Sequence, residues 1–255
     1  MKHIKKKYAF ESKELPNEVV QKAIKVTNPI LTDLNNSKLT VPFIQTDDGT
    51  YVKTFKYSKN SNEHIIIPIP DLTLVYFDSA YNLNKLRIEQ EEKLYTKLKI
   101  TEDKLGEQAI NEIYRYYGYA TSCVISLFTT LESFINHMIP DNSVYQKTLN
   151  HRTEVYTKEQ IQKAIQFEEK IKEVLPQLLT ITFQLKSPAY THIQNLKKLR
   201  DDIVHTKSDQ NLMQQEELIK RLLKFSFEET FNSVAKFINH YKQDYVIECD
   251  CGVDF

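Results

Sequence analysis

Apolar residues recur at steps of three and four through most of the chain after residue 78, which is the spacing of helices that bury one face. The longest helix is predicted to begin at Thr101, a candidate N-cap, and to end at Pro140. Pro176 is expected to kink or shorten the end of the next helix. The other helical stretches are Asn82–Leu98, Lys158–Leu179, Tyr190–His205 and Met213–Tyr241. Several long helices with short connections predict an antiparallel bundle.

The N-terminal part of the chain follows a different pattern, with five prolines and only short helical signals. Val41–Tyr57 is predicted to form a β-hairpin whose turn is Asp47–Thr50, because apolar and polar residues alternate after this turn. Ile65–Ile67 and Leu72–Phe77 are predicted as further short strands. This part is therefore expected to be a small α+β module.

The predicted fold class is mainly α, with the α+β module over residues 1–77 and a helical bundle over residues 78–255. Apolar residues make up 41% of the 255 residues and charged residues 27%, as in ordinary globular proteins. With only 4 glycines, a glycine-rich phosphate loop is disfavoured. The net charge of zero excludes a basic coat for nucleic acid, so any site for a polyanion must be local.

The sequence also bears on the compartment and on membranes. The charged start Met1–Lys7 is not followed by the apolar stretch of a signal peptide. No apolar run of about 18 residues predicts a transmembrane helix, and 3 cysteines argue against a disulfide framework. A cytoplasmic protein is expected. Cys249–Cys251 is either half of a metal site or a polar tail, and no second Cys/His pair at ligand spacing stands nearby, so neither metal nor cofactor is expected.

One run, Arg200–His205, has residue types and spacing suited to chemistry. At about 100° per residue, Arg200 falls at the edge of the apolar stripe of its helix, where a cation needs a partner or a function. Asp201 precedes His205 by four residues, so the two are expected to be neighbours on the helix surface. The stripe itself comprises Ile193, Leu196, Leu199 and Ile203.

These side chains suit RNA cleavage without a metal. An imidazole ordinarily titrates close to neutral pH, so His205 can take the proton of a ribose 2′-hydroxyl. Arg200 can hold phosphate oxygens through its planar fork of donors, and Asp201 can set the tautomer or the basicity of His205. The leaving 5′-oxygen also needs an acid, and one histidine serves one role at a time. A homodimer with two copies of the run facing each other would supply both.

The spacing alone leaves a structural alternative open. A histidine at a helix end can simply pair with Asp201, while Arg200 extends its charged head from the edge of the core. Lys197 and Lys207, together with Lys198, are expected to form a positive rim that attracts a phosphate backbone. The alternative for these lysines is solvation without a ligand.

The run Arg200-Asp201-x-x-x-His205 resembles the Arg–polar–x3–His signature of HEPN-domain proteins, and Ser126–Asn136 resembles their first core helix. The resemblance covers about residues 105–242. It implies a HEPN-like helical bundle, a dimer in which two motifs meet in a cleft, and metal-independent endoribonuclease activity of the kind found in toxin–antitoxin and antiphage systems. It also implies that Glu132 points at the Arg–His motif.

Glu132 and Asn136 lie one helical turn apart on the same face of that helix. Glu132 either orients Arg200 or is an exposed glutamate that pairs with a neighbouring helix. Asn136 either contacts the substrate or bonds to backbone near Pro140. Four tyrosines of the same helix either stack on RNA bases or cover a helix interface; they are Tyr114, Tyr116, Tyr117 and Tyr119.

The function expected from the sequence is that of a metal-independent endoribonuclease, a toxin or antiphage defence effector. Its expected catalytic residues are Arg200, His205, Asp201 and Glu132, and its expected substrate-binding residues are Asn136, Lys197 and Lys207. The expected partners are RNA, a second copy of the chain, and an antitoxin or other regulatory protein. Two alternatives stay open: a non-catalytic helical module that binds RNA, a nucleotide or a protein, and a purely structural or regulatory subunit.

Overall fold

The computed structural model describes residues 3–14, 43–60, 63–99, 109–205 and 212–250. Contacts between residues divide the chain into two units, Lys6–Val75 and Met1–Lys5 with Tyr76–Phe255. The first unit contains a small sheet, and the second consists mostly of helices. The predicted fold class is therefore confirmed at this level: the described chain is mainly helical, with a small N-terminal sheet.

The sheet of the N-terminal unit is built around β3 (Tyr51–Ser58). β2 (Phe43–Gln45) and β1 (Glu11–Ser12) pair antiparallel with the first part of β3, and β4 (His64–Pro68) pairs antiparallel with its second part. Gly49 has a φ of 83° in the turn between β2 and β3, a backbone conformation that side chains other than glycine rarely adopt. The predicted hairpin and the strand at Ile65–Ile67 are confirmed, while Val41 and Pro42 lie outside the described residues.

The strand predicted at Leu72–Phe77 is wrong, because this stretch is the beginning of helix α3 (Leu72–Lys97). The carboxylate of Asp71 accepts a hydrogen bond from the backbone N–H of Leu74 at 3.2 Å and so satisfies one of the free donors at the helix start. Leu74 and Phe77, three residues apart, are both buried. The apolar pattern of a short run is the same for a buried strand and for a buried helix face, so it did not distinguish the two. The hydrogen bond from Leu74 to Asp71 favours the helix.

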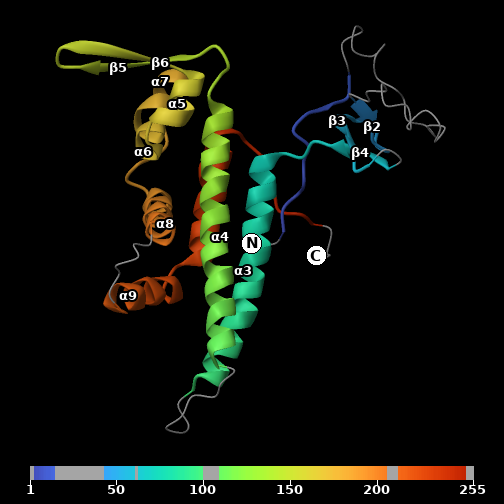
Figure 1. Ribbon diagram of the computed structural model, residues 1–255. Helices are drawn as coiled ribbons and strands as arrows, with labels where there is room; N and C mark the ends of the chain where they lie inside the picture. The colour runs from blue at the N-terminus through green and yellow to red at the C-terminus, as the bar shows by residue number, and fades with distance from the viewer. Residues whose placement is uncertain (1–2, 15–42, 61–62, 100–108, 206–211, 251–255) are drawn as a thin grey trace. The chain divides into compact units, whose positions relative to one another are not determined.

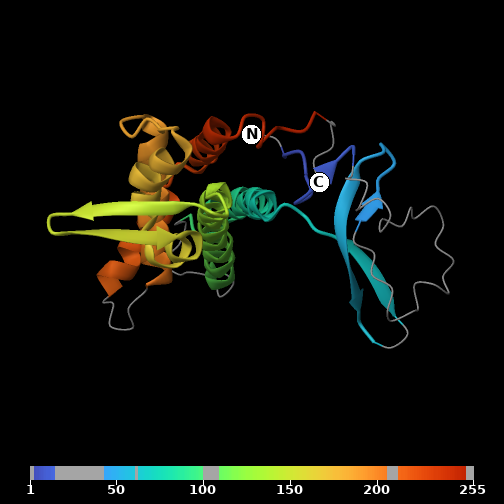
Figure 2. The same cartoon turned by 90° about the horizontal axis from the view of Figure 1, so that it is seen from above.

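Helix α4 (Ala109–Met138) is the longest element of the helical unit and supplies much of its core. It lies beside α3, antiparallel to it, and α8 (Pro188–Val204) and α10 (Phe227–Tyr241) pack against it (Figures 1 and 2). The predicted end at Pro140 is confirmed, and the predicted cap Thr101 lies outside the described residues. Despite its length, neither α4 nor any other helix in the described part of the chain is apolar enough to cross a membrane.

The helix predicted over Lys158–Leu179 is wrong as a single element. The structure has α5 (Lys158–Ala164), α6 (Phe167–Glu169), the π-helical turn η1 (Lys170–Val174) and α7 (Leu175–Leu179). The break follows α5, where Ile165 adopts an extended conformation with φ −85° and ψ 132° and is buried together with Phe167. Both side chains reach the core only if the backbone turns, so tertiary packing overrides the helical pattern here. Pro176 is the second residue of α7, which follows η1 without a gap, and the helix ends three residues later at Leu179.

The helix predicted over Met213–Tyr241 is also two helices, α9 (Leu212–Leu223) and α10. The apolar stripe advances by three and four residues up to Phe225 and then by six to Phe231, and the break falls in this interval. The hydroxyl of Thr230 donates to the carbonyl oxygen of Ser226 in the first turn of α10. The break forms the floor of a cleft beside α8.

A second hairpin, β5 (Val144–Leu149) with β6 (Arg152–Thr157), follows α4 and was not predicted from the sequence (Figure 2). Its strands are largely exposed, and their less exposed positions include the charged Lys147 and Glu154, so the sequence lacks the apolar–polar alternation that marks a half-buried strand. Tyr145 is the exception: it is buried, stacks on Tyr156 with 6.0 Å between ring centroids, and donates to Glu173 at 2.9 Å.

Replacing Leu127 by alanine tests the central role of α4. Leu127 is completely buried, so the substitution removes apolar contacts and leaves a cavity. The free energy of unfolding, measured by urea denaturation, is expected to fall by about 2–5 kcal/mol. Tyr114→Ala on the same helix, where the side chain is 72% exposed, is expected to change it by no more than about 0.5 kcal/mol. Equal losses in both variants would contradict the assignment of the core.

Candidate functional site

Arg200 of α8 and Glu132 of α4 form an ion pair between these two helices, with 3.2 Å between Nη2 and Oε2. The guanidinium lies over the ring of Phe128, with Cζ at 4.5 Å from the ring centroid. Phe128 precedes Glu132 by four residues, so both project from the same face of α4. The structure therefore brings Glu132 and Arg200 together, an arrangement that the resemblance implied and that the residues alone left open.

A second carboxylate contacts the same guanidinium. Asp201 accepts a hydrogen bond from Nη1 of Arg200 at 2.9 Å and one from Nζ of Lys197 at 2.8 Å. Burial raises the pKa of Asp201, but the hydrogen bonds from Lys197 and Arg200 outweigh burial and leave the pKa below its ordinary value. Asp201 is thus a carboxylate at neutral pH, and it draws two of the predicted site residues into one charged cluster.

The cluster lies at the edge of the helical unit rather than inside it. The side chain of Arg200 is 26% exposed and that of Glu132 is 41% exposed. Within the described residues, the guanidinium uses two of its five N–H donors in these hydrogen bonds. Arg200 is held in orientation by two carboxylates and an aromatic ring, and it keeps donors for an incoming anion such as a phosphate.

His205 stands apart from this cluster. It is the C-cap of α8, it is exposed, and its backbone N–H donates to the carbonyl oxygen of Asp201 at 2.9 Å. No hydrogen bond joins its imidazole to any other residue in the part of the chain that the structure describes. At about 100° per residue, His205 lies about 140° around α8 from Arg200, so the two side chains leave the helix on different sides. The carboxylate of Asp201 contacts Lys197 and Arg200, and only its backbone contacts His205.

Asn136 has a partner that the sequence did not suggest. Its side-chain oxygen accepts a hydrogen bond from Nζ of Lys170 at 3.1 Å, and its backbone oxygen accepts one from the side chain of Gln162 at 3.2 Å. Lys170 is only 7% exposed and also donates to the carbonyl oxygen of Gln162 at 3.0 Å. Burial lowers the pKa of Lys170, while the negative charge of Glu132 acts in the opposite direction. Lys170 therefore adds a buried cation near the Glu132 side of the cluster.

The sequence did not single out Lys170 as a site residue, because it lies in the charged stretch Glu168–Lys172, whose pattern is typical of a solvated helix face. The structure places it at the start of η1, and π-helical turns are frequent at functional sites. The lysine is buried there together with Ile171 and Val174 of the same turn. No property of a single sequence indicates such a turn, because its hydrogen bonds depend on the packing around it.

The remaining candidates are spread over the molecule. Lys207 and Cys251 lie outside the described residues. Tyr116 is buried and Tyr114 is 72% exposed, so the tyrosines of α4 do not share one surface. Lys198 lines a cleft on another side of α8. Among the described residues, no group of three or more His, Cys, Asp or Glu side chains could hold a metal ion.

Comparison of this chain with protein-family models, curated proteins and solved structures found no match. The resemblance to HEPN-domain proteins therefore stays a prediction from the residues around Arg200 and Glu132. By its own geometry, the described chain is a mainly helical protein with an oriented, partly exposed arginine on α8 and an exposed histidine at the end of the same helix.

A double-mutant cycle tests the ion pair between α4 and α8. Glu132→Gln, Arg200→Gln and the double variant are compared with the wild type by urea denaturation. We expect a coupling free energy of about 0.5–1 kcal/mol, because the arginine is partly buried and lies over an aromatic ring. The surface pair Glu168 and Lys172 on one helical segment is the matched control, with about 0.3 kcal/mol expected. A coupling at Glu132 and Arg200 no larger than the control would contradict the pairing.

The lowered pKa of Asp201 predicts a pH dependence of stability. Below its ordinary pKa of about 3.9 the unfolded chain takes up a proton at Asp201 before the folded chain does. The stabilisation by this carboxylate is therefore complete above that pH and is lost as the pH falls through the lower, folded-state pKa. Asp201→Asn is expected to lower stability at neutral pH and to weaken its decline in acid, measured by thermal unfolding across the pH range. An unchanged acid dependence would argue against the hydrogen bonds of Asp201.

Proposed function

We propose that this protein is a metal-independent endoribonuclease of the HEPN type that works as a homodimer in the cytoplasm. One observation carries the proposal: the guanidinium of Arg200 is held in place by Glu132, Asp201 and Phe128 at a partly exposed edge, five residues before an exposed histidine. An oriented guanidinium and an accessible imidazole are the groups that cleavage of RNA without a metal needs. The resemblance of the Arg200–His205 run to HEPN proteins supports the same reading.

The proposed reaction is an internal transfer at a phosphodiester. His205 takes the proton of a ribose 2′-hydroxyl, and the 2′-oxygen attacks the adjacent phosphorus. Arg200 donates hydrogen bonds to the non-bridging phosphate oxygens, on which negative charge increases in the transition state. The bond from phosphorus to the 5′-oxygen then breaks, and this oxygen takes a proton from a second histidine. The products are a 2′,3′-cyclic phosphate and a free 5′-hydroxyl.

The second histidine is the reason for proposing a dimer. Within one chain His205 cannot act as base and acid in the same step, and it leaves α8 about 140° around from Arg200. His205 of a second copy would supply the acid, and Arg200 and His205 from different copies would meet at one phosphate. Glu132 and Asp201 act in this scheme as positioning residues for Arg200. Asn136 and Lys170 form the neighbouring polar wall, and Lys197 and Lys207 contribute positive charge for the RNA backbone.

A toxin or antiphage effector is the biological role that fits this activity. A nuclease that cuts RNA by transfer within the substrate needs no cofactor, and as a toxin it would have to be held inactive in its own cell. An antitoxin or other regulatory protein is the partner that this role implies.

A second candidate function is a non-catalytic helical module that binds RNA. The specific observation in its favour is that Arg200 pairs with two carboxylates, which reduces its net charge toward an incoming phosphate. In this case the Glu132–Arg200 pair serves mainly to fix α8 on α4. The two candidates differ in whether RNA is cut.

The decisive experiment incubates wild type, His205→Ala and Arg200→Ala with total RNA in the presence of EDTA. Wild type is expected to cut RNA and to leave 2′,3′-cyclic phosphate ends, detected by their resistance to alkaline phosphatase until mild acid opens the ring to a phosphomonoester. Each variant is expected to lose about 100-fold or more in rate, because general acid–base catalysis and electrostatic stabilisation each contribute about that much.

Two substitutions serve as controls. His151→Ala in the turn between β5 and β6 and Arg115→Ala on α4 remove an exposed histidine and an exposed arginine elsewhere in the helical unit, and both are expected to leave the rate unchanged. The monomer–dimer equilibrium is measured by sedimentation. Intact RNA with the wild type, equal cutting by His205→Ala, or a fully active monomer would each contradict the proposed mechanism.

A further inference from the structure

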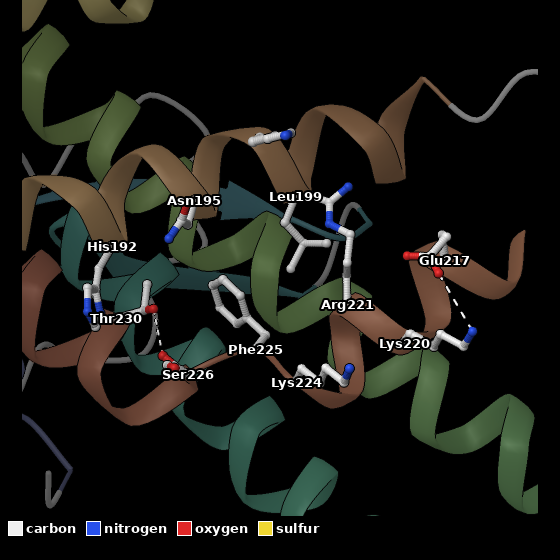
Figure 3. A pocket seen from close by; sticks show the side chains of 11 residues that line it. His192, Asn195, Leu199, Glu217, Lys220, Arg221, Lys224, Phe225, Ser226 and Thr230 are labelled. Atoms are coloured by element: carbon white, nitrogen blue, oxygen red, sulfur yellow. Dashed lines mark hydrogen bonds and ion pairs between the residues drawn. The ribbon is translucent and has the colours of Figure 1, made fainter. Parts of the chain in front are cut away.

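A cleft of about 570 Å³ lies between α8, the end of α9 and the start of α10 (Figure 3). α8 contributes His192, Asn195 and Leu199 to its wall, and Phe225 and Ser226 come from the break between α9 and α10. This volume is within the range of small-ligand sites, about 300–1,000 Å³. The cleft is on another face of α8 than the Glu132–Arg200 cluster, because Asn195 and Arg200 are about 140° apart around the helix.

The charged residues that line this cleft are mainly cations. Lys198, Lys220, Arg221 and Lys224 line it together with one carboxylate, Glu217. Arg221 is paired with Asp202 on α8, and Lys220 is paired with Glu217 and with the nearby Glu216. These two cations are largely neutralised by their partners.

Lys198 and Lys224 are different. Neither forms an ion pair with another of the described residues, and both are exposed. They come from two segments, Lys198 from α8 and Lys224 from the residue that follows α9. Two unneutralised ammonium groups that flank one cleft favour an anion with several oxygens, such as a phosphodiester.

An aromatic ring completes the lining. Phe225 is only partly buried, and its ring packs edge-on against Phe227 at a centroid distance of 4.9 Å, which leaves the ring oriented in the cleft. Figure 3 shows the ring of Phe225 beneath α8, between Leu199 and the start of α10. The amide of Asn195 also points down into the cleft from α8 (Figure 3). An oriented ring next to unpaired cations is a combination that binds a base and its phosphate together.

We propose that this cleft binds a nucleotide unit of single-stranded RNA, with a phosphate on Lys198 and Lys224 and the base on Phe225. The inference rests on the proposed function, because it takes RNA as the substrate. Lys198 precedes His205 by seven residues, so both lie within about 20° on one side of α8 and about 10 Å apart along its axis. RNA held in the cleft would thus continue along α8 toward His205, which makes the cleft a positioning site for the strand.

Binding is tested in a His205→Ala background, which holds RNA without the proposed cleavage. The affinity for a short fluorescent single-stranded oligoribonucleotide is measured by anisotropy at several salt concentrations. Replacing Lys198 and Lys224 together by glutamine is expected to lower the affinity about tenfold and to reduce the slope of log K against log salt by about 1–2. Phe225→Leu is expected to lower the affinity roughly tenfold with little change in that slope, because it removes stacking and no charge.

The matched control replaces two exposed lysines elsewhere in the helical unit, Lys163→Gln with Lys236→Gln, and so changes the net charge equally. Thermal unfolding checks that each variant is folded. Equal affinities of the cleft and control variants would overturn the inference. A free mononucleotide that competes as well as the oligoribonucleotide would also overturn it, because the cleft would then serve a small ligand rather than a strand.

The results separate this inference from the proposed function. If wild type cuts RNA and the cleft variants cut and bind as wild type does, the nuclease stands and the cleft proposal fails. If no variant or wild type cuts RNA but binding depends on Lys198, Lys224 and Phe225, the cleft proposal stands and the protein is the non-catalytic RNA-binding module.

Discussion

The burial of α4 is the constraint on which the rest of the helical unit depends. Its stripe of fully buried residues, among them Leu127, Leu131 and Phe134, is covered by α8 and α10, and α3 lies beside the same helix (Figure 1). The position of α8 follows from that packing, and α8 carries both Arg200 and the wall of the cationic cleft. The polar residues of the candidate site are thus held by an apolar scaffold, which is why they can be oriented without being buried themselves.

The Glu132–Arg200 pair occupies the margin of this scaffold. An arginine there retains partial solvation, so its pairing with Glu132 and Asp201 avoids the full cost of burying charge. The ring of Phe128 restricts the guanidinium further. The same cluster therefore fixes α8 against α4 and presents an oriented cation at the surface, so structural and functional roles of Arg200 do not exclude each other. Lys170 of η1, which donates to Asn136, adds a positive charge near Glu132.

The two faces of α8 have different roles in the proposed function. One face holds Arg200 among carboxylates, and the other carries Lys198, which forms no ion pair with the described residues, beside the cleft. His205 at the end of the helix shares the side of Lys198 and is separated from Arg200 in the same chain. This separation is consistent with a site completed by a second copy, in which RNA bound along one α8 meets the arginine of the other.

The sequence by itself determined the helical character of the chain, the hairpin around Gly49 and the end of α4 at Pro140, because periodicity and turn chemistry are local properties. The pairing of Glu132 with Arg200 was one of two alternatives that the residues left open, and the packing of α8 on α4 brings the two side chains together. Tertiary structure decided the rest. The helix breaks at Ile165 and between α9 and α10 arise where buried side chains, such as Ile165 and Phe227, must contact a core that other elements form. A helical wheel of one segment does not show that core. Three further features depend on contacts between elements: the β5–β6 hairpin, the burial of Lys170 and the cleft beside Phe225. The spacing of residues along a single sequence does not predict such contacts.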